Sequence, residues 1–465
     1  MLVIACWVAI YLPALGSLEI KGEEGRRILP AVAMLETGNY LIPQVGGEAY
    51  YRKPPLVNWL VALSFKLTGV RNEWTARLPS VLCVFGVALA FVTIARRVLG
   101  NNGSLFAALI WLANFGIIEK GRLIEIEALY VSLFGLALIC WLTWWREGRS
   151  PWLIWTVPWF LLGLGILAKG PVHLVFFYAV VVALLYREGQ LRQLWGVPHL
   201  VGLLAMAGVF AAWALPYWRE MAAMDVGQTW SAQLTGRFTG DDFKLRSWVL
   251  NIPRGLAYFL PWTLLLPAVA KTKWSSAAER NLAWALAWGA ALPFLAVNLL
   301  PGGLPRYSMP ALVPACWLMA MMLANPEFPW HARMFTARGR FRLVLGVAAT
   351  AIVLLALYAV VFVPIRQRRA KVRPIAAQID RLVPETEPLY ALDPDFQPFL
   401  FYVKSRLVYV NRLEEVPPTA RYLLIQPEME NAVTESARWS PLRARPIERF
   451  TDYRRHTIIL AKVGE

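Results

Sequence analysis

The chain has 465 residues, of which 58% are hydrophobic and only 17% are charged. A soluble globular domain usually carries about 25% charged residues, so this balance excludes an ordinary soluble protein and indicates a membrane protein. The formal net charge of +17 would suggest nucleic acid in a soluble chain. In an apolar chain it points to anionic lipid instead. The four cysteines show no CxxC spacing, so we expect neither disulfides nor a thiolate metal site.

Long apolar runs recur through the first 365 positions and are separated by short charged loops. Because about 20 apolar residues cross the hydrocarbon core, we predict about eleven transmembrane helices. The first apolar run has no basic residues before it and no small-residue cleavage site, so we interpret it as a span rather than a signal peptide. The expected spans are residues 2–18, 76–95, 104–118, 128–145, 152–168, 172–186, 197–217, 255–270, 282–300, 308–324 and 343–363.

The orientation of these spans follows from their connecting loops. Five loops rich in basic residues alternate with loops that are poorer in them; their members include Arg97, Arg146, Arg187, Lys273 and Arg338. The positive-inside rule places these five loops in the cytoplasm. The remaining loops, and the chain after residue 364, are then expected outside.

The first external segment, residues 19–75, is too long to be a simple connector, and long loops often carry function. It contains a helical pattern over residues 26–36 and a glycine-rich turn at Gly46-Gly47. Pro54-Pro55 then starts the apolar stretch 56–67. At about a dozen residues this stretch is too short to span a bilayer, so we predict an interfacial helix.

The composition changes to that of a soluble domain near residue 365. Short β-rich runs at residues 407–410, 422–425 and 457–461 alternate with turn signals. We therefore predict two domains: an α-helical polytopic membrane domain over residues 1–364, and a small extracytoplasmic α/β domain over residues 365–465.

Three carboxylates are candidates for chemistry. Glu23 and Glu24 lie beside basic residues just after the first span, where a carboxylate can stay ionised and act as a general base. The alternative is a solvated charge cluster at a helix start. Glu127 adjoins the start of the fourth span, where the helix dipole favours an anion. Its alternative role is that of a helix-capping carboxylate.

Cations and aromatic residues form a second set of candidates. Tyr50, Arg52 and Lys53 precede the proline pair and suit a lipid phosphate, although an ordinary interfacial anchor would have the same composition. Lys169 lies in a loop of almost no length, so it must sit at the membrane boundary. Such a cation is functional by default, and snorkelling to the interface is the alternative.

Further cations occur in other predicted external loops. Arg237 lies in the long segment 218–254, and Arg306-Tyr307 follows a glycine pair. A guanidinium is a bidentate donor to phosphate, so these residues suit phosphate or pyrophosphate, whereas a solvated loop charge is the alternative. Asp393-Pro394-Asp395 has the DxD form, but we interpret it as an ordinary turn.

An ordered pattern in the first external segment carries a family resemblance. Residues 23–26, 34–43, 47–50 and 53–56 together closely resemble the bacterial membrane glycosyltransferases related to protein O-mannosyltransferases and to the aminoarabinose transferase of lipid A. The resemblance implies a C-type glycosyltransferase fold in the bacterial inner membrane. It also implies inverting transfer of a sugar from a polyprenyl-phosphate donor, outside the cytoplasm, to an envelope acceptor such as lipid A, a glycan or a protein. The resemblance continues at residues 76–80, 127, 168–171, 237–238, 261–262 and 306–310.

The resemblance also assigns roles to individual residues. The family's acidic base falls on Glu23, with Glu24 beside it, and the acid of the second external loop falls on Glu127; the relatives usually have aspartate there. Arg52 stands where the aminoarabinose enzymes have a metal-ligating glutamate, so we expect no metal and no other cofactor. The expected ligands of the donor's lipid phosphate are Tyr50, Arg52, Lys53, Lys169, Arg237, Arg306 and Tyr307.

Two other classes of function remain open. A lipid-linked saccharide transporter or flippase would place its charges near the membrane midplane, whereas the charges here cluster in the predicted external loops. A structural envelope protein would present residues 365–465 to a partner without any need for Glu23 or Lys53. The expected partners of the enzyme are the polyprenyl-phosphate sugar, membrane lipid and the envelope acceptor, with no nucleic acid.

Overall fold

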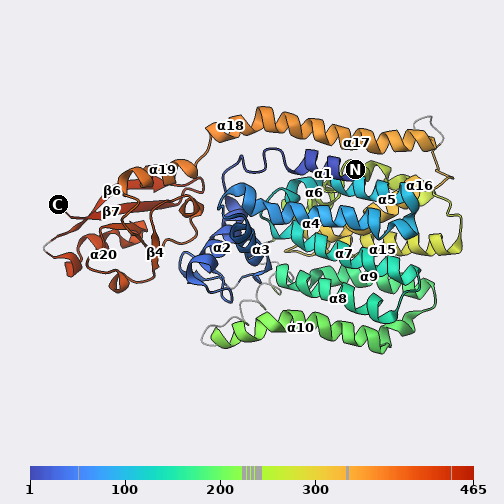
Figure 1. The fold of residues 1–465 in the computed structure, drawn as a ribbon, viewed down its shortest axis with the longest axis horizontal. Coiled ribbons are helices and arrows are strands. Elements are labelled where there is room, and N and C mark those ends of the chain that lie inside the picture. The colour runs from blue at the N-terminus through green and yellow to red at the C-terminus, as the bar shows by residue number, and fades with distance from the viewer. Residues whose placement is uncertain are drawn as a thin grey trace. The chain divides into compact units, whose positions relative to one another are not determined.

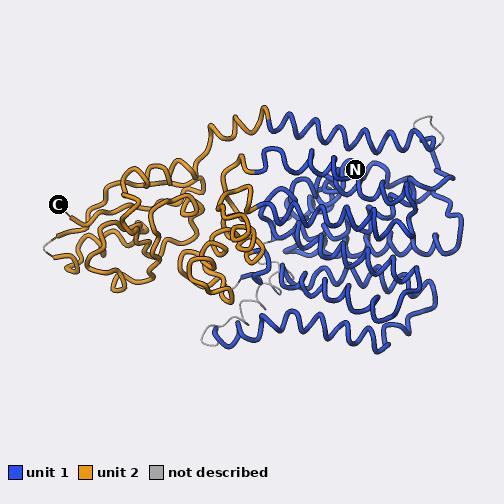
Figure 2. Tube along the Cα trace, in the orientation of Figure 1, with its two compact units in different colours: residues 1–15, 52–57, 77–359 blue, residues 16–51, 58–76, 360–465 orange. Residues whose placement is uncertain are grey.

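The computed structural model describes two compact units (Figure 2). Unit 1 comprises residues 1–15, 52–57 and 77–359, and unit 2 comprises residues 16–51, 58–76 and 360–465. Two segments of the first predicted external loop therefore group with the carboxy-terminal part of the chain. The residues described are 1–50, 52–221, 227, 231, 235, 243–330, 335–440 and 442–464.

Unit 1 is built from helices (Figure 1). Most of them are long, apolar and packed side by side. They are α1 (Leu2–Tyr11), most of α4 (Glu73–Thr93), α5 (Arg96–Leu112), α6 (Phe115–Gly121), α7 (Ile126–Arg146), α8 (Pro151–Ala168), α9 (Val172–Arg187), α10 (Val197–Glu220), α12 (Leu245–Val249), α13 (Asn251–Ala257), α14 (Leu266–Lys271), α15 (Ala277–Leu299), the 3-10 helix η4 (Pro305–Ala311), α16 (Leu312–Ala324) and α17 (Ala337–Leu357).

The chain is a multi-span membrane protein. Within the described residues, seven helices are long and apolar enough to cross a bilayer. The number rises to nine if two helix pairs, bent by 56° and 83°, each form one broken span. Every predicted span overlaps one of these elements or one of the shorter apolar helices α1 and α9.

Helix α7 lies at the centre of unit 1. In its most apolar stretch, 94% of the residues are buried, whereas in that of the helical run Ala337–Arg368, which includes α17, only 11% are buried. A helix that is apolar on all sides can be enclosed by protein, and in a bilayer an unburied apolar face meets lipid. Because α7 is enclosed by other helices, the side chains of its first turn have well-defined positions.

Four of the five basic loops meet at one end of unit 1. Arg97 lies 3.3 Å from Glu147, and Arg146 lies 3.6 Å from Glu188. Arg146 also donates a hydrogen bond to the carbonyl oxygen of Ala278, at 2.6 Å. These contacts join loops that the charge pattern places on the same side of the membrane.

Unit 2 begins with the elements of the first loop. The predicted helix is confirmed as α2 (Gly25–Thr37), and the predicted turn joins β1 (Gln44–Val45) to β2 (Glu48–Ala49). Gly46 and Gly47 in this turn have φ values of 63° and 86°, which favour glycine. The apolar stretch after Pro54-Pro55 forms α3 (Leu56–Thr68).

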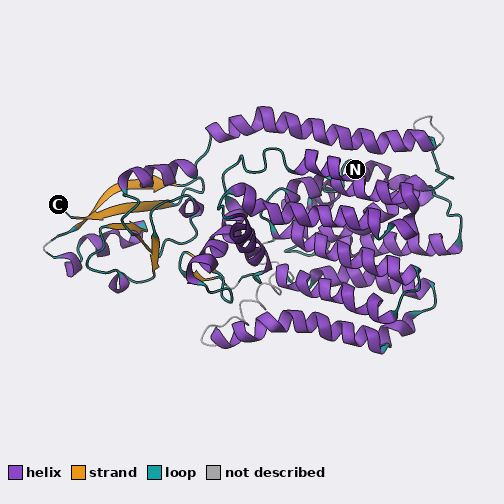
Figure 3. Cartoon of the chain, in the orientation of Figure 1, coloured by secondary structure: helices purple, strands orange, loops and turns teal. Residues whose placement is uncertain are grey.

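The rest of unit 2 is an α/β arrangement around a five-stranded mixed sheet (Figure 3). The strand order is β4-β3-β5-β7-β6; β3 pairs in parallel with β4 and β5, and the remaining pairs are antiparallel. The three predicted strands are confirmed as β4, β5 and β7. The bounds are β3 (Leu389–Leu392), β4 (Leu407–Val410), β5 (Tyr422–Ile425), β6 (Ala444–Thr451) and β7 (Thr457–Val463), with α18 (Val363–Arg368), α19 (Arg373–Leu382) and α20 (Glu430–Thr434).

Candidate active site

A buried carboxylate with two cations lies at the start of α7. Glu127 is the second residue of this helix, where free backbone N–H groups and the helix dipole stabilise an anion. Its Oε1 atom lies 3.2 Å from Nζ of Lys169 and 3.4 Å from Nε of Arg306. The structure thus brings together the predicted acid and two of the predicted phosphate ligands.

Lys169 is held by aromatic rings as well as by Glu127. It directly follows α8, and its side chain is only 12% exposed. Its Nζ atom lies 4.6 Å from the ring centre of Tyr307 and 5.1 Å from that of Tyr130, which are cation–π distances. Burial lowers the pKa of Lys169, while the charge of Glu127 acts in the opposite direction. The site therefore holds a desolvated cation in one orientation.

Two residues of this cluster were not predicted from the sequence. Tyr130 lies three residues after Glu127 on α7 and therefore on the same helix face. Its hydroxyl accepts a hydrogen bond from the backbone N–H of His173 at 2.5 Å and lies 3.2 Å from Nδ1 of the same histidine. The spacing from Glu127 was a usable signal for Tyr130. His173 gave none, because a histidine without metal-ligand spacing looks like a core residue.

A second ionic group adjoins this cluster in sequence. Nζ of Lys120 lies 3.1 Å from a carboxylate oxygen of Glu119 and 3.1 Å from one of Glu125. Glu125 is the residue before α7. Burial raises its pKa, and the charge of Lys120 lowers it. The start of α7 therefore carries a second, partly buried carboxylate close to Glu127.

Glu23 and Glu24 differ in accessibility. Both lie in the short 3-10 helix η1 (Gly22–Glu24) of unit 2. The side chain of Glu23 is 41% exposed, whereas Glu24 is 6% exposed. Nη1 of Arg26 lies 3.0 Å from Oε1 of Glu23, and Nη2 of Arg27 lies 3.4 Å from Oε2. Glu23 is therefore a solvent-accessible carboxylate held by two arginines, and Glu24 is buried.

Tyr50 belongs to the Glu23 group. Nη1 of Arg27 donates to the Tyr50 hydroxyl at 3.3 Å, and Nδ2 of Asn58 donates to the backbone oxygen of Arg27 at 2.8 Å. Arg27 thus connects Tyr50 to Glu23, and the amide of Asn58 fixes this arginine from α3. Tyr50 therefore contacts the guanidinium that also pairs with Glu23.

The remaining predicted ligands fall elsewhere. Arg52 and Lys53 belong to unit 1; Arg52 is exposed and Lys53 is half-buried. Arg237 lies outside the described residues. In the part of the chain that the structure describes, no group of three or more His, Cys, Asp or Glu side chains is placed to hold a metal ion. Among the described candidates, Glu127, Lys169, Arg306 and Tyr307 form one group in unit 1, and Glu23, Glu24 and Tyr50 form another in unit 2.

Comparison with known sequences finds similarity to sugar transferases. Residues 52–214 match the family described as dolichyl-phosphate-mannose-protein mannosyltransferase. The chain is 29% identical over 327 residues to the undecaprenyl phosphate-alpha-4-amino-4-deoxy-L-arabinose arabinosyl transferase 1 of Pseudomonas fluorescens, covering 67% of this chain and 57% of the relative. The corresponding transferase of Pseudomonas savastanoi pv. phaseolicola is 28% identical over 381 residues, covering 79% of this chain and 67% of that one.

A solved structure shows the same fold. ArnT from Cupriavidus metallidurans bound to undecaprenyl phosphate superposes with a TM-score of 0.70 at 17% identity, and the match covers 99% of this chain and 97% of that one. Its apo form gives a TM-score of 0.65. The chain spans a little more than half the length of the first curated relative, 57%. The resemblance seen in the sequence is thus confirmed in sequence and in fold.

Proposed function

We propose that this chain, a relative of the protein mannosyltransferases and the aminoarabinose transferases, is an inverting glycosyltransferase that uses a polyprenyl-phosphate sugar. The acceptor is a component of the cell envelope: lipid A, a glycan or a protein. The observation that carries this proposal is the cluster in which the nearly buried Glu127 and Lys169 meet the half-buried Arg306. The curated relatives are named for an undecaprenyl phosphate donor, which supports the same class of substrate.

The cations are suited to hold the departing lipid phosphate. As the bond between the anomeric carbon and the phosphate oxygen breaks, negative charge grows on the phosphate. Preorganised cations in a site shielded from water stabilise such charge strongly. Lys169 and Arg306 both contact Glu127, which holds the two cations in place where a phosphate could become their partner. Tyr50, Arg52, Lys53, Arg237 and Tyr307 complete the proposed set of phosphate-binding residues.

Glu23 is suited to act as the general base. In a single displacement the acceptor oxygen bonds to the anomeric carbon, the bond to the phosphate oxygen breaks, and the acceptor proton passes to a carboxylate. The side chain of Glu23 is exposed enough to meet an acceptor, and Arg26 and Arg27 orient it. Glu24 is buried and supports the turn, whereas Glu127 orients Lys169.

The residues present do not fit the metal site of the aminoarabinose enzymes. Arg52 is an exposed guanidinium, and the resemblance implies that the aminoarabinose enzymes have a metal-ligating glutamate at its position. In this proposal, Arg52 and the cations near Glu127 neutralise the leaving phosphate.

The proposed setting is the bacterial inner membrane, with eleven crossings. This number requires α1 and α9 to cross in addition to the longer helices and bent pairs. The five basic loops are cytoplasmic, and the gathering of four of them at one end of unit 1 supports that orientation. The active site and a domain formed by residues 365–465 are then extracytoplasmic, and residues 1–364 form the membrane domain.

A lipid-linked saccharide transporter is the alternative, and a structural envelope protein is a third reading. Transporters bind their substrates near the membrane midplane, often at broken helices. Here Glu127 lies in the first turn of α7, and Lys169 follows the last residue of α8. Charges at helix ends favour chemistry at the membrane surface over transport through the membrane.

Sugar transfer by the purified protein tests this function. The full chain in detergent would be incubated with a panel of labelled polyprenyl-phosphate sugars and with envelope extracts. We expect labelled product with at least one donor, and its loss in Lys169→Met. The matched control is Lys404→Met, which removes an exposed lysine paired with Glu385 in unit 2. Donor binding without transfer in any combination would contradict the enzyme and favour the transporter.

A further inference from the structure

The backbone just before Glu23 is tied to the carboxy-terminal part of unit 2. The N–H of Ile20 donates to the hydroxyl of Tyr402 at 2.6 Å, and the N–H of Gly22 donates to the hydroxyl of Tyr453 at 2.6 Å. Tyr402 follows the 3-10 helix Pro398–Phe401, and Tyr453 lies between β6 and β7. These hydrogen bonds join the turn that bears Glu23 to tyrosines that lie 382 and 431 positions further along the chain than their partners.

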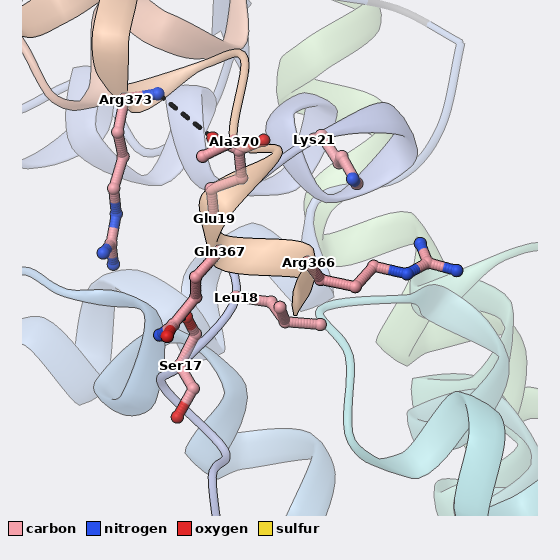
Figure 4. A pocket seen from close by; sticks show the side chains of 8 residues that line it. All are labelled: Ser17, Leu18, Glu19, Lys21, Arg366, Gln367, Ala370 and Arg373. Carbon is pink, nitrogen blue, oxygen red and sulfur yellow. Dashed lines mark hydrogen bonds between the residues drawn. The ribbon is translucent and has the colours of Figure 1, made fainter. Parts of the chain in front are cut away.

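Glu19 fixes the start of this segment. Its carboxylate accepts hydrogen bonds from three consecutive backbone N–H groups, those of Lys371, Val372 and Arg373, at 3.0, 2.9 and 3.1 Å. These groups precede and begin α19, and an anion there satisfies unpaired donors and the helix dipole. Figure 4 shows the side chain of Glu19 directed at this backbone, beside Ala370. Glu19 is therefore a helix cap rather than a base.

Tyr402 also reaches a second buried carboxylate. Its hydroxyl donates to Oε1 of Glu73 at 2.7 Å, and the guanidinium of Arg373 donates to the same oxygen, with Nε at 3.0 Å. A phenol has one proton to give and lone pairs to accept with, so Tyr402 can serve Ile20 and Glu73 at once. Burial and then the charge of Glu73 raise the pKa of Tyr402, so the phenol keeps that proton.

Phe396 packs against the arginine that pairs with Glu23. The guanidinium of Arg26 lies 5.0 Å from the centre of this ring, and that of Arg454 lies 4.9 Å from it. A Cβ atom added to Gly25 would come within 2.8 Å of the same ring. Arg26 is the partner of Glu23, so Phe396 positions the arginine that orients the carboxylate.

The turn needs such external ties because it has little structure of its own. The 3-10 helix η1 has three residues, and Gly22 has a φ value of 57°, a conformation that a glycine also leaves readily. A displacement of about 1 Å in a reacting group can cost about a hundredfold in rate. The position of a base on this turn therefore depends on the contacts that surround the turn.

We propose that Tyr402 and Tyr453 are positioning residues that set the orientation of Glu23. The carboxy-terminal sheet and its loops are then part of the catalytic apparatus and not a separate binding module. This inference rests on the proposed function, because it takes Glu23 as the base. The hydrogen bonds of Tyr402 and Tyr453 to the segment before Glu23 do not depend on the proposed function, and they can be tested without an activity assay.

The test combines exchange and kinetics in single hydroxyl deletions. Tyr453→Phe removes one acceptor, and Tyr402→Phe removes an acceptor together with the donor to Glu73; both variants keep the ring. Tyr390→Phe on β3 is the matched control, because the hydroxyl of Tyr390 makes no hydrogen bond to the residues that the structure describes. We expect faster amide hydrogen exchange over residues 19–27 in both variants. We also expect kcat to fall about ten- to hundredfold with little change in the donor KM, at an unaltered thermal midpoint.

A double-mutant comparison decides whether the tyrosines act through Glu23. In a Glu23→Gln background, Tyr402→Phe should cause no further loss of kcat, because the positioned group is already gone. Wild-type exchange over residues 19–27 in both tyrosine variants would overturn the tie itself. An equal loss of kcat with and without Glu23 would overturn the positioning role. Full activity of Glu23→Gln would overturn the base assignment and this proposal with it, while the exchange result would still report the tie.

Discussion

Nζ of Lys169 lies 3.2 Å from Oε1 of Glu127, and both side chains are nearly excluded from solvent, at 12% and 7% exposure. Arg306 approaches the same oxygen at 3.4 Å. A buried charge persists only when it is paired, so this carboxylate is the common partner of two cations. The arrangement fixes the positions of both cations in the free protein, before a phosphate binds.

The two members of this pair should differ in their effect on stability. Glu127→Ala leaves Lys169 without its carboxylate and should destabilise the protein by about 3 kcal/mol or more. Lys169→Met should cost less, because Glu127 keeps Arg306. Thermal unfolding of the two purified variants in the same detergent measures the difference. A larger loss in Lys169→Met would show that the charges are not coupled in this way.

The two adjacent glutamates should differ in their effect on catalysis. Glu23→Gln removes proton acceptance and should lower kcat at least about a hundredfold with little change in the donor KM. Glu24→Gln should have a smaller effect on kcat, because Glu24 is buried. Steady-state kinetics with an identified donor provide the comparison. If the acceptor is already an anionic phosphate it needs little help from a base; a mild Glu23→Gln effect with a severe Lys169 effect would then remove the base assignment but not the donor site.

The orientation in the membrane predicts which loops a reagent can reach. Single cysteines at positions 21 and 404 should react with an impermeant thiol reagent in intact cells, and those at positions 97 and 338 should react only after lysis. The background lacks Cys6, Cys83, Cys140 and Cys316. External labelling at position 338 is the outcome that the proposed topology does not allow.

Turnover should survive chelation, because Arg52 stands in place of the expected metal ligand. The measurement is the initial rate of sugar transfer before and after EDTA treatment and dialysis, with an Arg52→Glu variant alongside. We expect the wild-type rate to be retained. Complete loss that an added divalent cation restores would show that a required ion binds elsewhere in the chain.

The local elements of the fold were predictable from the sequence. Strands β4 and β5 occupy the predicted residues, because β-branched and aromatic runs between turn residues leave little choice. The predicted first span, residues 2–18, is longer than the helix observed there. Helix α1 ends at Tyr11 because Pro13 follows and Ala14 has a φ value of 53°. The predicted span over residues 104–118 is broken where Asn114 caps α6.

The tertiary ties of the site were not predictable in the same way. The neighbours of Glu127 come from loops that are 42 and 179 residues further along; the sequence marked Lys169 and Arg306 as candidate cations but not as neighbours of Glu127. Glu19 caps a helix more than 350 residues further along the chain. No local pattern encodes such pairings, because they depend on how distant segments pack.

The most direct test of the account is the binding of undecaprenyl phosphate, the expected leaving group, to purified wild-type protein, Lys169→Met and the control Lys404→Met. A hydrogen bond to a charged group is worth about 1.5–3 kcal/mol, so loss of Lys169 should weaken binding about tenfold or more. Lys404→Met should bind as the wild type does, since Lys404 is an exposed residue of unit 2. Equal affinities for all three proteins would contradict the assignment of the Glu127 cluster as the site of the lipid phosphate.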